Sequence, residues 1–140
     1  MKSTVFMLRQ QSHKHFPFFT GRVRAGFPSQ ADDYIEKQLD FNEYLVRHPA
    51  ATFCVKVSGD SMINAGIFPE DILVVDRALN AVNNSIVIAV VNGEFTVKRI
   101  QFHHDKISLL PENPAYNPIH IDNENFEIWG VVTYVIHRAK

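Results

Sequence analysis

Ser61 is the residue whose surroundings could support covalent chemistry. It belongs to the turn sequence Ser-Gly-Asp-Ser-Met at residues 58–62, directly after a strand-like run. A glycine turn at a strand end can expose a serine hydroxyl and point successive backbone N–H groups in one direction, as an oxyanion requires. The alternative is an ordinary turn or helix-capping serine. Because a hydroxyl is a weak nucleophile, the choice depends on whether a base lies within reach.

Lys98 is the best candidate for that base. It lies in the run Glu-Phe-Thr-Val-Lys-Arg-Ile at residues 94–100, where strand alternation puts Thr96 and Ile100 on the same face as Lys98. Apolar neighbours would partly desolvate the amine, and the Thr96 hydroxyl could orient it. Burial can lower a lysine pKa from about 10.4 to the value of about 7–8 that a base needs at neutral pH. The alternative is a solvated lysine on a sheet edge.

The histidines and the cysteine are weaker candidates. Of the seven histidines, His103 and His104 are adjacent and should point to opposite faces of a strand, and the others have no triad context. Cys54 lies in the middle of a strand-like run and is expected to be a packed hydrophobe. Asp60, as a turn aspartate, is expected to bond backbone amides. No residue spacing predicts a metal site or a phosphate loop, so no cofactor is expected.

The elements that position these residues are mostly strands. Beyond residue 51 the chain is rich in Val, Ile, Phe and Thr, with turn residues between the runs. Asn92-Gly93 predicts a two-residue hairpin turn of type I′, because both positions of that turn require a positive φ. The predicted strands cover residues 52–58, 72–77, 85–91, 94–103, 106–110 and 126–137.

The N-terminal part differs from the rest. Residues 1–28 contain two prolines and two glycines without a sustained period, which predicts an extended arm before a domain at 29–140. Ser29 with Asp32 makes a plausible helix N-cap, and apolar residues follow at helical spacing to Leu39. Asp40 with Glu43 repeats the capping pattern and predicts a second short helix that ends by Pro49.

Composition limits the class of protein. The chain has 140 residues, 46% of them hydrophobic, which suits one domain with a substantial core. A single cysteine excludes an internal disulfide and favours a cytoplasmic location. No apolar run approaches the length of about 20 residues that spans a bilayer, so no membrane-spanning segment and no membrane partner are predicted.

The charge is unevenly distributed. Residues 1–25 contain five Lys or Arg residues and no Asp or Glu. The remainder holds 14 − 5 = 9 basic and 15 acidic side chains, a balance of −6. A basic arm therefore precedes an acidic body, and such an arm can bind nucleic acid or lie on its own domain.

Three motifs together resemble the LexA-like Ser/Lys autoproteases (peptidase S24). The first is the turn at 58–62 with Glu-Asp-Ile-Leu-Val-Val-Asp at 70–76, and the second is Asn-Gly-Glu-Phe-Thr-Val-Lys-Arg-Ile at 92–100, with 98 − 61 = 37 residues between serine and lysine. The third, Val-Arg-Ala-Gly-Phe-Pro-Ser at 23–29, is similar to the self-cleavage site of that family. The resemblance covers about residues 22–136.

The resemblance implies a fold and a set of site residues. The fold would be mainly β, the LexA-like C-terminal protease fold of twisted, partly barrel-like sheets with short helices and an extended N-terminal arm. The site would hold Ser61 and Lys98 as catalytic residues, with Thr96 and Met62 supporting them. The cut would fall between Ala25 and Gly26.

Within that family the chain looks most like the UmuD/MucA/RumA-type SOS mutagenesis proteins. Only 25 residues precede the expected cut, which leaves no room for the DNA-binding domain of a repressor. This implies a cytoplasmic homodimer that cuts itself on a RecA–single-stranded DNA filament. The shortened form would join a UmuC-type Y-family DNA polymerase in translesion synthesis, with replicative polymerase subunits as further partners.

Two other functions compete. A signal-peptidase-like Ser/Lys protease has a similar serine turn, but it needs a membrane anchor. After its Lys-Arg strand that class has a glycine-proline-rich loop, whereas residues 101–105 here read Gln-Phe-His-His-Asp. A non-catalytic β binding module would keep the fold and use Ser61 and Lys98 for no chemistry. Incubation at alkaline pH separates the non-catalytic module from a protease, because only an active dyad yields two fragments.

Overall fold

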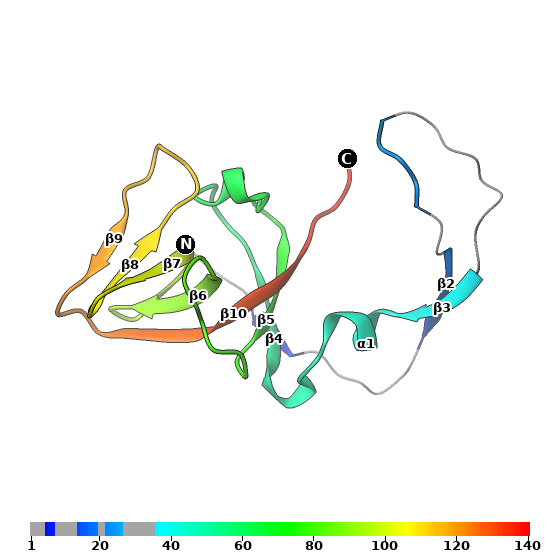
Figure 1. The fold of residues 1–140 in the computed structure, drawn as a ribbon, viewed down its shortest axis with the longest axis horizontal. Coiled ribbons are helices and arrows are strands. Elements are labelled where there is room, and N and C mark those ends of the chain that lie inside the picture. The colour runs from blue at the N-terminus through cyan, green and yellow to red at the C-terminus, as the bar shows by residue number, and fades with distance from the viewer. Residues whose placement is uncertain (1–4, 8–13, 20–21, 27–35) are drawn as a thin grey trace.

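The computed structural model describes residues 5–7, 14–19, 22–26 and 36–140, and in these the chain is mostly β, as expected. Eight strands form an antiparallel sheet in the order β1-β4-β5-β10-β6-β7-β8-β9, and β2 and β3 form a separate pair (Figure 1). The strands are β1 (Val5–Met7), β2 (His15–Phe19), β3 (Glu36–Asp40), β4 (Thr52–Lys56), β5 (Ile72–Asp76), β6 (Ile86–Val91), β7 (Glu94–His103), β8 (Lys106–Leu110), β9 (Ile119–Ile121) and β10 (Phe126–Ile136). The helical elements are α1 (Phe41–Leu45) and the 3₁₀ turns η1 (Pro49–Ala51) and η2 (Ile63–Ala65).

The long strand β10 joins the two halves of the large sheet. Its first part pairs with β6 and its second with β5, and its register shifts between Ile128 and Gly130 and between Val132 and Tyr134. Such irregularities bend a strand and increase its twist. In Figure 1, β10 accordingly crosses the body from the β6–β9 side to the β4–β5 side.

Two groups of buried apolar side chains form the core. One lies around the β4–β5 side and includes the residue that follows Ser61; the other lies around the β6–β8 side. The first consists of Phe53, Val55, Val57, Met62, Ile67, Leu73, Val75, Ile88 and Val97, and the second of Val87, Ala89, Ile100 and Leu109. The turn that carries Ser61 is therefore anchored in the core.

Gly130 lies where β10 crosses close to β5. A Cβ atom built there would lie 2.7 Å from Val75 Cγ1 and 3.1 Å from the Asp76 carbonyl oxygen, and Val75 is itself fully buried. We therefore expect Gly130→Ala to lower the free energy of unfolding by about 1–3 kcal/mol, the usual effect of overpacking a core. Urea denaturation measures this change in the free energy of unfolding. Glu127→Ala, at an exposed position of the same strand, is the control. Equal stability of the two variants would contradict the expectation.

The hairpin of β6 and β7 confirms the predicted turn. Asn92 has φ +50° and Gly93 has φ +82°, the positive values that a type I′ turn requires. The pairing places Lys98 opposite Val87, which is fully buried. The hairpin thus carries Lys98 into the interior of the sheet.

The N-terminal predictions are correct only in part. The helix expected from Ser29 to Leu39 is wrong at residues 36–39, which belong to β3, and residues 29–35 lie outside the described part of the chain. In β3, Leu39 pairs with Phe16 of the arm, so a tertiary strand partner overrides the helical spacing. The second helix is confirmed as α1, with Asn42 N–H donating to Asp40 Oδ1 at 2.9 Å, although it ends at Leu45.

The arm forms strands in its described residues. Besides the β2–β3 pair, β1 pairs with β4 and extends the large sheet. The Phe16 ring contacts that of Phe41 with centroids 5.6 Å apart, while Phe16, Phe18 and Phe19 each remain about half exposed.

In the described part of the chain, no helix is long and apolar enough to cross a membrane.

Candidate active site

Ser61 lies in a tight turn after β4. Gly59 has φ +85°, a left-handed conformation that favours glycine. Met62 is almost completely buried, and its carbonyl oxygen accepts hydrogen bonds from the N–H groups of Ala65 and Ile67. Core packing of Met62 therefore fixes the turn, while the Ser61 side chain stays half-buried.

Lys98 contacts Ser61 directly. Its Nζ lies 3.0 Å from Ser61 Oγ, 2.7 Å from Thr96 Oγ1 and 3.1 Å from the Val97 carbonyl oxygen. Only 7% of the residue is exposed, and this burial lowers the pKa of the Lys98 amine. The structure thus brings together the serine, the lysine and the threonine that the sequence analysis selected.

A groove opens beside this pair. Its volume is about 810 Å³, and it runs between the Ser61 turn and the β6–β7 hairpin. Within the described residues, the N–H groups of Ser61 and Met62 have no hydrogen-bond acceptor, and Ser61 lines the groove, where its N–H is available to an oxyanion. The lining residues are Ser58, Gly59, Asp60, Ser61, Val91, Asn92, Gly93, Glu94, Phe95, Thr96, Lys98, Tyr116 and Ile119.

A loop between β8 and β9 supports the Ser61 turn, and no sequence pattern indicated this contact. Glu112 exchanges main-chain hydrogen bonds with the turn, since its N–H donates to the Ser61 carbonyl at 2.8 Å and its carbonyl accepts from Asn64 N–H at 2.8 Å. Asn113 Nδ2 donates to the Asp60 carbonyl at 2.9 Å. The Pro-Glu-Asn-Pro sequence at 111–114 signals a turn, but it contains no sign of what the turn contacts.

Asp60 does not behave as expected. Its carboxylate accepts a hydrogen bond from the Tyr116 hydroxyl at 2.6 Å, whereas the prediction was a bond to backbone amides. The partner is 56 residues away in sequence, so local turn statistics could not identify it. This bond raises the pKa of the Tyr116 phenol.

The expected cleavage site is not in the groove. Ala25 and Gly26 form an exposed bend, and none of residues 22–26 lines the groove at Ser61. In Figure 1 this segment lies above β2 and β3, apart from the β6–β7 hairpin at the left of the view. In this structure the two residues of the dyad are therefore in contact with each other, while the expected scissile segment lies outside the groove.

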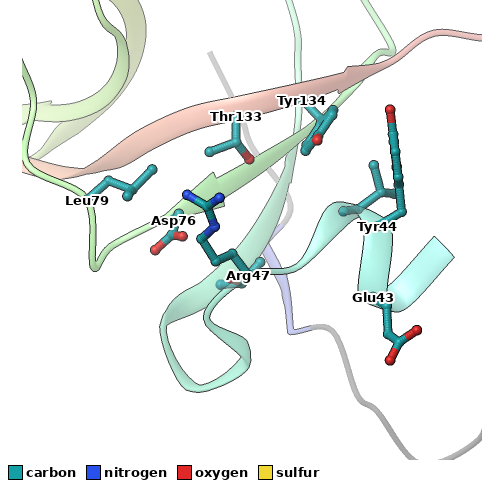
Figure 2. Close-up of a pocket in the computed structure, with 9 residues that line it drawn as sticks. Glu43, Tyr44, Arg47, Asp76, Leu79, Thr133 and Tyr134 are labelled. Carbon is teal, nitrogen blue, oxygen red and sulfur yellow. The ribbon is translucent and has the colours of Figure 1, made fainter. Parts of the chain in front are cut away.

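The histidines form pairs away from Ser61. His48 Nδ1 lies 2.6 Å from Asp76 Oδ2, and His137 Nδ1 lies 2.6 Å from Asp71 Oδ1. Asp76 lines a second pocket of about 470 Å³, shown in Figure 2, whose lining residues include no serine or cysteine. The two threonines there, Thr52 and Thr133, donate to main-chain carbonyls. Among the described contacts, neither of these histidine–aspartate pairs thus has a nucleophilic side chain beside it.

Other histidine arrangements are also incomplete. Ser108 Oγ lies 3.0 Å from His120 Nδ1 on strands β8 and β9, but no carboxylate contacts that ring in the described residues. The rings of His103 and His104 lie 4.5 Å apart, so the prediction of opposite faces is wrong, because His104 has φ +55° and already belongs to the turn. Cys54 is buried as expected, and burial raises the pKa of its thiol.

Comparison with known proteins places the chain in a family. A model of Peptidase S24-like proteins matches residues 17–133. The chain is 50% identical over 124 residues to the protein SamA of Salmonella typhimurium, covering 89% of this chain and 86% of SamA. It is 45% identical over 137 residues to the protein MucA of Escherichia coli, covering 96% and 93% of the two chains.

A LexA repressor is also similar. The repressor of Clostridioides difficile is 42% identical over 121 residues, which cover 86% of this chain and 57% of the repressor. The family match extends over the turn after β4, the β6–β7 hairpin and the part of β10 up to residue 133. The chain therefore belongs to the peptidase S24-like family, among the SOS mutagenesis proteins of the UmuD and MucA type.

Proposed function

We propose that this protein is a serine endopeptidase that cuts its own backbone between Ala25 and Gly26. Ser61 is the nucleophile and Lys98 the general base. The observation that carries the proposal is the 3.0 Å contact between Lys98 Nζ and Ser61 Oγ, made by a lysine of which only 7% is exposed. The test is incubation of the purified chain at alkaline pH followed by mass spectrometry, which should find a new N-terminus at Gly26.

The chemistry follows from this geometry. The neutral Lys98 amine takes the proton of Ser61 Oγ, which attacks the Ala25 carbonyl carbon. The N–H groups of Ser61 and Met62 receive the developing oxyanion. The Lys98 ammonium then gives its proton to the departing Gly26 amine as the Ala25–Gly26 bond breaks, leaving an ester on Ser61. Water hydrolyses that ester, with Lys98 again as base.

The supporting residues keep this pair in place. Thr96 Oγ1, at 2.7 Å from Lys98 Nζ, directs the amine toward Ser61. Met62 holds the turn through its burial in the core. Neither side chain needs to exchange a proton with the scissile bond.

Cleavage requires a change in the arm. Because Ala25 and Gly26 lie outside the groove, the described conformation does not cut. A RecA–single-stranded DNA filament would stimulate the reaction by favouring the conformer with the arm seated in the groove, a shift that needs a few kcal/mol of differential binding. This activation by an external partner agrees with the disengaged arm.

The biological role rests on the family. We propose that the protein is a cytoplasmic homodimer of the SOS response and that its shortened form assists a UmuC-type Y-family DNA polymerase in translesion synthesis. Replicative polymerase subunits are further partners in this scheme. The similarity to MucA over 96% of the chain supports it.

Spontaneous self-cleavage should speed up with rising pH. The base acts only as the neutral amine, and burial lowers the pKa of Lys98, so the rate should rise as pH passes through this lowered pKa and level off above it. Gel assays of the purified chain between about pH 7 and about pH 10 measure the rate, with circular dichroism to confirm that the fold persists. A rate that stays flat over this range would contradict a lysine base that titrates within it.

A further inference from the structure

We propose that Tyr116 is a positioning residue for Ser61 and that it acts through Asp60. The inference rests on the proposed role of Ser61 as nucleophile. Tyr116 follows β8 on the loop that crosses to β9, and its hydroxyl donates to Asp60 Oδ1 at 2.6 Å. Asp60 is joined to Ser61 by a peptide bond, so a hydrogen bond to its side chain restrains the nucleophile directly.

The turn needs such a restraint. Gly59 stands immediately before Asp60 in a left-handed conformation, and a Cβ atom at Gly59 would meet nothing within 4 Å. No side-chain packing against Gly59 therefore holds this position of the turn. Met62 anchors the other end in the core, which leaves the orientation of residues 60 and 61 to hydrogen bonds.

Apart from the Lys98 contact with Ser61 Oγ and a bond within the turn from Ile63 N–H to the Asp60 carbonyl, those hydrogen bonds come from one loop. The Asp60 carbonyl accepts from Asn113 Nδ2 at 2.9 Å, and its carboxylate accepts from Tyr116 at 2.6 Å. The bond from Tyr116 is charge-assisted and short, and it lies at the solvent-exposed side of the turn. The same loop is tied to the strand of Lys98, because Arg99 Nε pairs with Glu112 Oε1 at 2.7 Å. The loop thus links the turn of Ser61 to the strand of Lys98.

Tyr116 keeps its donor proton under the conditions of cleavage. The hydrogen bond to Asp60 raises the pKa of the phenol above its ordinary value of about 10. The restraint therefore persists at the alkaline pH at which Lys98 is neutral. Loss of the hydroxyl should loosen the Ser61 turn without removing any group that exchanges protons with the substrate, and small misplacements of reacting groups cost large factors in rate.

The test is a double-mutant cycle on the self-cleavage of the full chain at about pH 9. We expect Tyr116→Phe and Asp60→Ala each to slow cleavage about tenfold and the double variant to be no slower than either one, because both remove the same hydrogen bond. Asp60→Asn should retain most of the rate, since an amide oxygen also accepts from Tyr116. Tyr134→Phe, at a comparably exposed tyrosine on β10, is the control and should cut at the wild-type rate.

The outcomes separate this inference from the proposed function. A wild-type rate of self-cleavage in Tyr116→Phe overturns the inference about Tyr116. Losses that multiply to about hundredfold in the double variant also overturn it, because Tyr116 would then act on something other than Asp60. The proposed function and the inference about Tyr116 both require that Ser61→Ala is inactive. Self-cleavage by Ser61→Ala would instead overturn the proposed function, and this inference with it.

Discussion

Ser61→Ala and Lys98→Ala should each abolish self-cleavage while the fold persists. In a nucleophile–base unit, removal of either member loses nearly the whole effect of both, so we expect each variant to be slower by about 10⁴-fold or more and the double variant to be no slower. The 3.0 Å contact makes these two side chains one unit. Gel quantification of the two fragments measures the loss.

Matched variants separate loss of chemistry from loss of structure. Lys98→Met keeps an unbranched apolar stem in the buried space and removes only the amine, so it should be as inactive as Lys98→Ala and more stable. Lys106→Ala and Ser108→Ala, which lie on β8 away from the groove, should cut at the wild-type rate. If Lys98→Met cut normally while Ser61→Ala did not, the base would have to be another group.

The sequence predicted those parts of the fold whose causes are local. Asn92 and Gly93 adopt positive φ because their own turn requires it, and β7 and β8 have the predicted bounds. The β9 strand was missed, since residues 119–121 form an edge strand of only three residues, too short for an alternating pattern to identify. The helix expected before Leu39 is wrong because the pairing of Leu39 with Phe16 is a contact between residues far apart in sequence.

The candidate site shows the same limit. Alternation along β7 was enough to place Thr96 beside Lys98, and the 2.7 Å contact agrees with it. The contact between Lys98 and Ser61 depends on how β4 and β7 come together, which the family resemblance supplied and periodicity alone could not. Tyr116 and Asn113 reach Asp60 across 56 and 53 residues, and no local pattern indicates either contact.

Removal of residues 1–25 should change the surface of the protein in three ways. The formal charge goes from −1 to −6, because five basic side chains leave and no acidic ones do. The β4 strand loses β1, its partner on one side, and so gains a free edge that another chain could pair with. Finally, β3 loses β2, and the Phe41 ring loses its contact with Phe16.

These changes predict that cleavage activates by exposure. A chain that begins at Gly26 should support lesion bypass without a RecA filament, and Ser61→Ala in that shortened chain should be harmless, because the arm is already gone. Full-length Ser61→Ala should fail in the same assay, since it cannot shed the arm that occupies β4 and β3. The measurement is a mutagenesis or bypass assay of the two Ser61→Ala proteins at equal abundance. Equal activity would show that the arm does not block a partner surface and that the cut serves another purpose, such as turnover.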